Sequence, residues 1–217
     1  PLKMKRFRLI LLMALLTIAG AIHAHRYVGG DLSMLLKYEA QGATYLDLEG
    51  NNIDDVLTFV KAQGWNTIRV RLFDNPSLID DKAVCQDPEY VAILGKRIKE
   101  AGLYFMLDIH YSDTWADPGQ QLIPQGWLVW SWLLDESVYK YTKEWLEALV
   151  QAGATPDLIQ TGNEISFGML WGADLGQGYE EFETDGGHLQ ATDDWTAYTD
   201  KNWVNFSNML KSASRAC

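Results

Sequence analysis

The sequence predicts an α/β fold, namely the N-terminal half of a (β/α)8 TIM barrel with about four β/α units. Short apolar or β-branched runs alternate strictly with longer amphipathic stretches. No Pro-rich or Ser-rich linker interrupts this alternation, which indicates a single domain. Polar residues gather where each predicted strand ends, and in a barrel those ends meet at one rim.

Four strands and four helices are expected along the chain. The predicted strands are 27–31, 67–73, 104–110 and 157–162, and the predicted helices are 54–63, 87–101, 137–151 and 195–212. A doubly wound sheet is the alternative, but no GxGxxG motif follows the first strand. A complete barrel needs about 250 residues, so we expect this chain to supply about half of the units.

The N-terminus, residues 1–24, is expected to be a signal peptide with the residues that precede it. Basic residues between positions 5 and 8 come before an unbroken apolar run, 9–22, which is too short to span a bilayer comfortably. We therefore expect a secreted, periplasmic or cell-surface protein whose single domain occupies residues 25–217. After removal of the signal, no association with a membrane is expected.

The composition argues against several kinds of partner and site. The 217 residues carry a net charge of −11, which repels the phosphates of nucleic acids and anionic lipid surfaces. We therefore expect no nucleic acid partner. Cys85 and Cys217 belong to no CxxC or zinc-binding spacing, so both are expected to be free, and neither a metal nor a cofactor is expected.

Glu164 is the candidate acid/base residue at the predicted rim. It follows the fourth predicted strand, where partial burial would favour the protonated carboxyl that a general acid requires. Asn163 beside it could bind a hydroxyl next to the reacting centre. A glutamate at a strand end is more often structural or solvated, so the Asn-Glu pair is a weak signal by itself.

Five segments in order carry a resemblance to a known family. They are YVGGDLSM (27–34), GWNTIRVRLF (64–73), DIHYSDTWADPG (108–119), QTGNEI (160–165) and GMLW (168–171). Together they resemble the arabinogalactan endo-β-1,4-galactanases, glycosyl hydrolase family 53. The likeness runs almost continuously from Tyr27 to Trp171.

The resemblance implies a glycosidase that cleaves β-1,4-galactan, the side chains of arabinogalactan and pectin, from within the polysaccharide and with retention of configuration. It implies that Glu164 is the proton donor. The implied nucleophile is a glutamate at the end of a seventh strand, which this chain lacks, so we expect the chain alone to be inactive or nearly so. The calcium-binding loops of the family are also expected to be absent, and no metal ligand is carried over.

Other residues near the predicted rim are candidates for binding the polysaccharide. Arg71 could hold a catalytic carboxylate in its ionised state or form a structural salt bridge. His110 could donate to a sugar hydroxyl or be a satisfied core group. Tryptophan rings stack on the apolar faces of sugars but are also normal core residues. The substrate-binding candidates are Asn163, His110, Arg71, Trp115, Trp171, Asp31 and Asp108.

Two other functions remain open on the sequence alone. A carbohydrate-binding protein without catalysis would use the tryptophans and Asn163. A related glycosidase would act on another β-1,4-glycan, such as xylan, mannan or cellulose. Only the family likeness favours galactan.

Overall fold

The computed structural model describes residues 26–127, 131–166, 168–174, 179–181 and 201–217. The expected signal peptide, 1–24, lies outside these ranges. The first part of the predicted last helix, 195–200, lies outside them as well.

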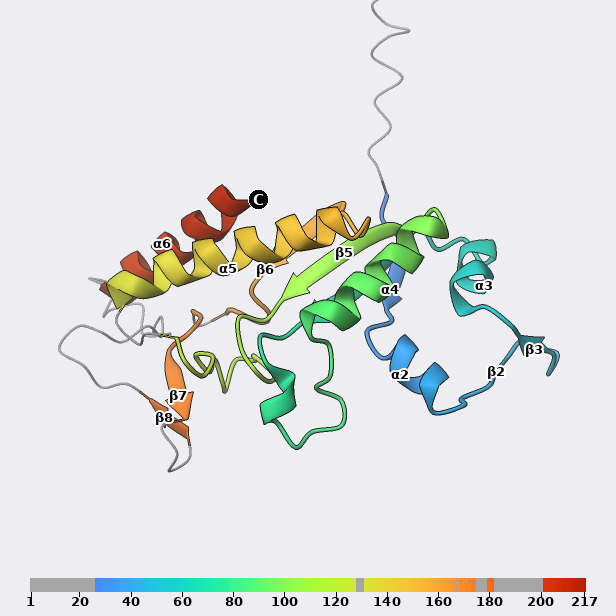
Figure 1. Cartoon of the computed structure of the whole chain (residues 1–217), viewed down its shortest axis with the longest axis horizontal. Helices are drawn as coiled ribbons and strands as arrows, with labels where there is room; N and C mark the ends of the chain where they lie inside the picture. Colours follow the sequence, from blue (N-terminus) through green and yellow to red (C-terminus); the bar gives the residue numbers. More distant parts are fainter. Residues whose placement is uncertain (1–25, 128–130, 167, 175–178, 182–200) are drawn as a thin grey trace, which may run out of the picture.

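Four parallel strands form the main sheet (Figure 1). They lie side by side in the order β1 (Gly29–Asp31), β4 (Thr67–Leu72), β5 (Tyr104–Ile109) and β6 (Leu158–Thr161). Each strand neighbours the next one of the predicted series, without the reversal of order that a doubly wound sheet contains. This order confirms the predicted α/β fold, a run of successive β/α units from a TIM barrel.

The predicted helices follow the strands in alternation. Asp55 and Asp87 cap the first two, because their carboxylates accept the backbone N–H groups of Thr58 and Tyr90 at 2.6 and 2.8 Å. The four helices are α3 (Val56–Ala62), α4 (Pro88–Glu100), α5 (Ser131–Gln151) and α6 (Lys201–Ala216).

Some element boundaries differ from the prediction. Helix α5 begins at Ser131, nearly two turns earlier, because the buried Leu134 extends its apolar stripe. Helix α6 ends about one turn later, because Ala213 is buried too. The elements missed are too short to show a period: α2 (Leu35–Ala40), the 3-10 turn η1 (Pro76–Leu78), the hairpin of β2 (Tyr45–Leu46) and β3 (Asn52–Ile53), and the hairpin of β7 (Gly172–Asp174) and β8 (Tyr179–Glu181).

One face of the sheet is apolar and packs against the helices. A Cβ atom on Gly95 of α4 would lie 2.7 Å from the ring of Phe105, so only glycine allows this close approach. Arg69, Arg71 and Asp108 alternate with the apolar residues and therefore project to the opposite face. The buried apolar side chains of β4 and β5 are Ile68, Val70, Leu72, Phe105, Leu107 and Ile109.

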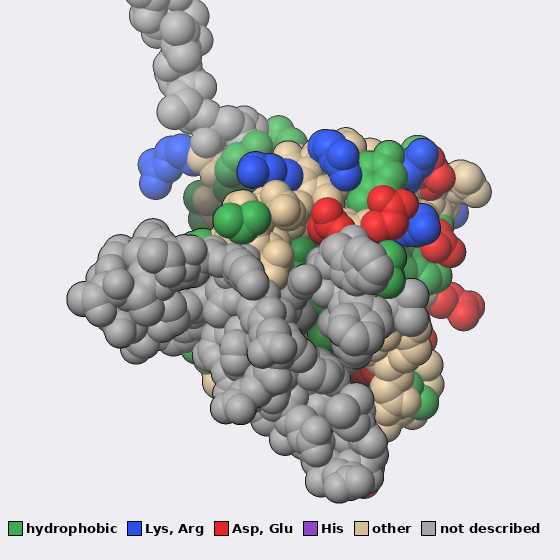
Figure 2. Space-filling model, turned by 90° about the vertical axis from the view of Figure 1, so that its left-hand side faces the viewer, with side chains coloured by type: hydrophobic (Ala, Val, Ile, Leu, Met, Phe, Trp, Pro, Cys, Tyr) green, Lys and Arg blue, Asp and Glu red, His purple; other side chains and the backbone are tan. Residues whose placement is uncertain are grey.

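The described surface carries charges of both signs. Acidic and basic side chains lie next to one another on the face shown in Figure 2. Helix α5 carries two ion pairs between residues four positions apart, Lys140 with Glu136 at 3.4 Å and Lys143 with Glu147 at 3.9 Å. Within the residues described, no helix is both long enough and apolar enough to cross a membrane.

Candidate active site

A cleft of about 290 Å³ lies at the carboxyl ends of the four parallel strands. Side chains from four distant parts of the sequence meet there, as in other barrels whose sites are built at this rim. Six of the eight residues predicted for the site line the cleft. The full lining is Asp31, Arg69, Arg71, His110, Trp115, Ala116, Asp117, Asn163 and Glu164.

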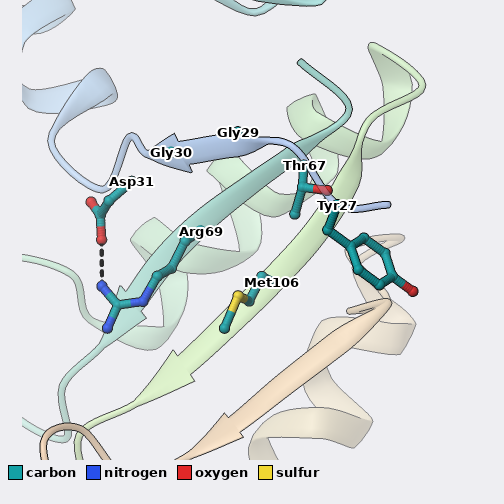
Figure 3. A pocket seen from close by; sticks show the side chains of 7 residues that line it. All are labelled: Tyr27, Gly29, Gly30, Asp31, Thr67, Arg69 and Met106. Carbon is teal, nitrogen blue, oxygen red and sulfur yellow. Dashed lines mark hydrogen bonds and ion pairs between the residues drawn. The ribbon is translucent and has the colours of Figure 1, made fainter. Parts of the chain in front are cut away.

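Arg69 is the centre of a polar network at the floor of this cleft. Its Nη1 donates to Asp31 Oδ2 at 2.7 Å, and Figure 3 shows the two side chains reaching toward each other from β4 and β1. Its Nη2 donates to Asn163 Oδ1 at 2.8 Å and also to the carboxylate of Asp108. One guanidinium thus binds two carboxylates and an amide on three different strands or strand ends.

Arg69 was not among the predicted site residues. The register pairs Asp31 with Arg69 across β1 and β4, so the two side chains lie on one face of the sheet. Sequence spacing places Arg69 and Arg71 on this same face. A single sequence does not show which of the two arginines meets which carboxylate, because that depends on the pairing of strands far apart in the chain.

Most hydrogen-bonding groups of Asn163 are paired with other residues of the protein. Its Nδ2 donates to the carbonyl of Ala116 at 2.7 Å, and its Oδ1 accepts from Arg69. Its backbone carbonyl accepts from Gln121 Nε2 at 2.9 Å. An amide has two N–H donors, and the contact with Ala116 uses one of them. The contacts also join the end of β6 to the loop after β5.

His110 lines the cleft, yet the residue is only 1% exposed. Its Nδ1 accepts the backbone N–H of Ala116 at 3.1 Å, which places the proton of the neutral ring on Nε2. That Nε2 lies 3.2 Å from Asp108 Oδ2, without the alignment of a hydrogen bond. Its ring packs against Phe73 with centroids 4.6 Å apart. These contacts hold the loop that carries Trp115 against the sheet.

Trp115 and Arg71 form one wall of the cleft. The Arg71 guanidinium lies over the indole, 4.6 Å from the ring centroid, an arrangement that attracts a cation to the π-face. Arg71 Nη2 is also 3.6 Å from Asp31 Oδ1. Trp115 Nε1 donates to Asp81 Oδ2 at 3.0 Å, which fixes the ring plane. Trp115 remains partly exposed, with one face covered by Arg71.

Glu164 lines the cleft and lies in a turn of unusual backbone conformation. Its φ is +48°, and Gly162 before it has a φ of +97°. A left-handed non-glycine residue costs about 1–3 kcal/mol and is typical of functional sites. The Glu164 side chain is exposed, so the expected partial burial of its carboxyl is wrong for this structure. The unusual feature of Glu164 is therefore its left-handed backbone conformation and not the burial of its carboxyl.

Two predicted residues lie outside the cleft lining. Asp108 is 0% exposed and binds Arg69 from below, so it anchors the arginine instead of facing the cleft. Trp171 is 4% exposed and belongs to the apolar core, so it offers no open ring face to a sugar. Because Asp108 and Trp171 are both buried, the structure does not support the prediction that they contact the substrate directly.

The described residues contain no group of three or more His, Cys, Asp and Glu side chains placed to hold a metal ion. Cys85 and Cys217 are free thiols. The side chains that line the cleft offer carboxylates, arginines, an amide and an indole.

Comparisons with known proteins agree on one group of relatives. The family model described as glycosyl hydrolase family 53 matches residues 27–217. A probable arabinogalactan endo-β-1,4-galactanase A of Neosartorya fischeri is 38% identical over 162 residues, which cover 71% of this chain and 42% of that protein. The arabinogalactan endo-β-1,4-galactanase of Cellvibrio japonicus is 37% identical over 167 residues, covering 76% and 43% respectively.

A solved structure of a fungal β-1,4-galactanase has the same arrangement of elements. It aligns with a TM-score of 0.70 and 32% identity, over 89% of this chain and 49% of that one. The chain thus spans less than half the length of the curated relatives named above.

Proposed function

The chain belongs to glycosyl hydrolase family 53, and from this premise we propose that it contributes the acid/base half of an endo-β-1,4-galactanase that works with retention. The observation that carries the proposal is the position of Glu164, an exposed residue in a left-handed turn that lines the cleft at the strand ends. The substrate would be the β-1,4-galactan of arabinogalactan and pectin side chains. Relatives that carry the galactanase name support this choice.

Glu164 has the access that a general acid and base needs. In a retaining reaction one carboxyl protonates the leaving oxygen and then, as a carboxylate, activates the water that completes hydrolysis. The exposed Glu164 side chain can reach both a glycosidic oxygen and water. Asn163 supplies its remaining N–H to a sugar hydroxyl beside the bond that breaks.

The nucleophile would be a second carboxylate about 5 to 5.5 Å from Glu164. Asp31 and Asp108 are poor candidates because both are bound to Arg69, which lowers the availability of their oxygens for attack. We propose that the nucleophile is a glutamate on a later strand of the barrel, and that Arg71 helps to keep it ionised. Trp115 would face a sugar ring at the cleft wall.

The proposed substrate also fits an exported protein. A polysaccharide of this kind lies outside cells, so we propose that residues 1–24 act as a signal peptide and that the protein is secreted, periplasmic or attached to the cell surface. The net charge of −11 suits a neutral substrate and disfavours nucleic acid.

The test is Glu164→Gln in a full-length version of the enzyme, assayed on β-1,4-galactan. We expect kcat to fall by about 10²- to 10⁴-fold, the usual contribution of a general acid and base, while galactan binding is mostly kept. Glu100→Gln, at an exposed position on α4, is the matched control and should leave kcat unchanged. Parallel assays on xylan, mannan and cellulose check the substrate. Unchanged turnover in Glu164→Gln would exclude Glu164 as the acid/base residue. Galactan binding without any turnover in the unsubstituted enzyme would leave only the carbohydrate-binding function.

A further inference from the structure

A second cavity, of about 340 Å³, lies beside the middle of α5. It shares no lining residue with the cleft of Glu164 among those described. Three parts of the chain meet there: Asp74 just after β4, the end of the loop that follows β5, and one face of α5. The lining residues are Asp74, Gly126, Trp127, Ser137, Lys140, Tyr141, Glu144 and Trp145.

Three aromatic side chains, Trp127, Tyr141 and Trp145, form what we call the aromatic cluster. The Tyr141 ring meets Trp127 with centroids 5.4 Å apart at 60°, and Trp145 with centroids 6.2 Å apart at 71°. Both tryptophans are partly exposed. Flat apolar faces at the wall of a cavity are suited to the C–H face of a sugar ring.

The hydroxyl of Tyr141 has no hydrogen-bond partner among the described residues, although the residue is only 6% exposed. Buried hydroxyls are normally paired, so this one needs an explanation. Tyr111, the neighbouring buried tyrosine, shows the usual arrangement: its hydroxyl is 2.7 Å from Thr142 Oγ1. Since Tyr141 lines the cavity, a ligand hydroxyl is the simplest partner for its own hydroxyl.

Side chains of both charges surround the aromatic cluster and offer hydrogen-bond donors and acceptors. Asp74 and Glu144 offer carboxylate oxygens, and Lys140 offers an ammonium group. Burial raises the pKa of Asp74 to about 6, with a further contribution from the charge of Asp113, so its carboxyl can also carry a proton near neutral pH. This mixture matches sugar hydroxyls, which both donate and accept. A cationic ligand would be opposed by Lys140.

We propose that this cavity is a second saccharide-binding site, in which the aromatic cluster, Asp74 and the Tyr141 hydroxyl hold one neutral sugar ring outside the cleft of Glu164. The site goes beyond the proposed hydrolase activity, because none of its lining residues takes part in that reaction. It would keep the protein on a polysaccharide independently of the cleft.

The test is a titration of the full chain with β-1,4-galactotetraose, followed through the indole N–H signals of Trp127 and Trp145 by NMR. We expect both signals to shift in a saturable way, and to do so equally in the cleft variant Trp115→Ala. Tyr141→Phe should weaken this binding at least tenfold, because it removes only the hydroxyl. Tyr111→Phe, the matched control, should leave the affinity unchanged.

Either of two results overturns the proposal: indole signals that stay fixed, or a Tyr141→Phe variant that binds as tightly as the unsubstituted chain. Signals that move with tetramethylammonium and not with the tetrasaccharide would show a cation site and overturn it too. Loss of binding in the cleft alone, with the cavity signals still responding, would instead count against the proposed hydrolase and support the second site.

Discussion

Arg69 Nη2 donates a hydrogen bond of 2.8 Å to Asn163 Oδ1, joining two residues that are 94 positions apart. The bond connects β4 to the turn after β6, and the same guanidinium holds Asp31 and Asp108. Glu164 follows Asn163 directly, so the network on Arg69 fixes the base of the turn from which Glu164 projects. Arg69 is thus a positioning residue for the candidate active site.

Substitution of Arg69 by methionine should be strongly destabilising. The change leaves the fully buried Asp108 carboxylate without its counter-ion, and breaking a buried ion pair costs about 3–5 kcal/mol. We expect the lower end of that range because Arg69 is partly exposed. Urea unfolding measures the change. Arg97→Met removes partly exposed pairs with Glu39 and Asp55, neither of which is fully buried, and should cost about 1 kcal/mol or less. Equal losses in the two variants would contradict the assigned role of Arg69.

Gly162→Ala should disturb the turn that presents Glu164. The new Cβ would lie 2.7 Å from Ile165 Cγ2, in addition to the cost of a φ of +97°. Gly126→Ala is the matched control, because its φ is +86° and a Cβ there meets open space. We expect Gly126→Ala to lose about 1–2 kcal/mol of unfolding free energy and Gly162→Ala to lose more. A loss at Gly162 no larger than that at Gly126 would argue against the close contact.

The pH dependence of stability should reveal Asp74. Burial raises its pKa to about 6, above the usual value of 3.8, so the folded protein holds this proton more tightly than the unfolded chain. Stability from this group is therefore present below about pH 4 and is lost as pH rises through 6. Asp74→Asn should match the unsubstituted protein near pH 4 and become relatively more stable near pH 7.

Urea midpoints at the two pH values measure this difference for Asp74. Asp54→Asn removes a charge from an exposed position and controls for the change in net charge. A stability difference that has the same size at both pH values would exclude the assigned titration of Asp74.

Much of the fold could be predicted because the strands are long enough to show a pattern. The stretches 67–73 and 104–110 are nearly continuous in apolar or β-branched character, and both became strands of the sheet. The carboxyl ends of parallel strands meet at one rim, so Asp31 and Glu164 were expected in one site and line one cleft. The short hairpins carry too few residues for any period and were missed.

The details of the site depended on contacts that no local pattern encodes. Arg69 and Arg71 are equivalent in spacing, but only the sheet order β1-β4-β5-β6 gives Arg69 its three polar partners, which are Asp31, Asp108 and Asn163. Trp171 was expected at the cleft, whereas the fold places it in the core. Glu164 was expected to be partly buried, but it is exposed and lies in a left-handed turn. In each case the tertiary environment decided the outcome.

The most direct test of the role of Glu164 is azide rescue of Glu164→Ala in a full-length version of the enzyme. With an aryl β-galactoside, whose leaving group needs no proton, the variant should form the covalent glycosyl intermediate and then stall, because no base activates water. Azide should restore the rate, and NMR should identify a β-galactosyl azide product. A rate that azide does not restore, or an α-galactosyl azide, would contradict Glu164 as the acid/base residue of a retaining galactanase.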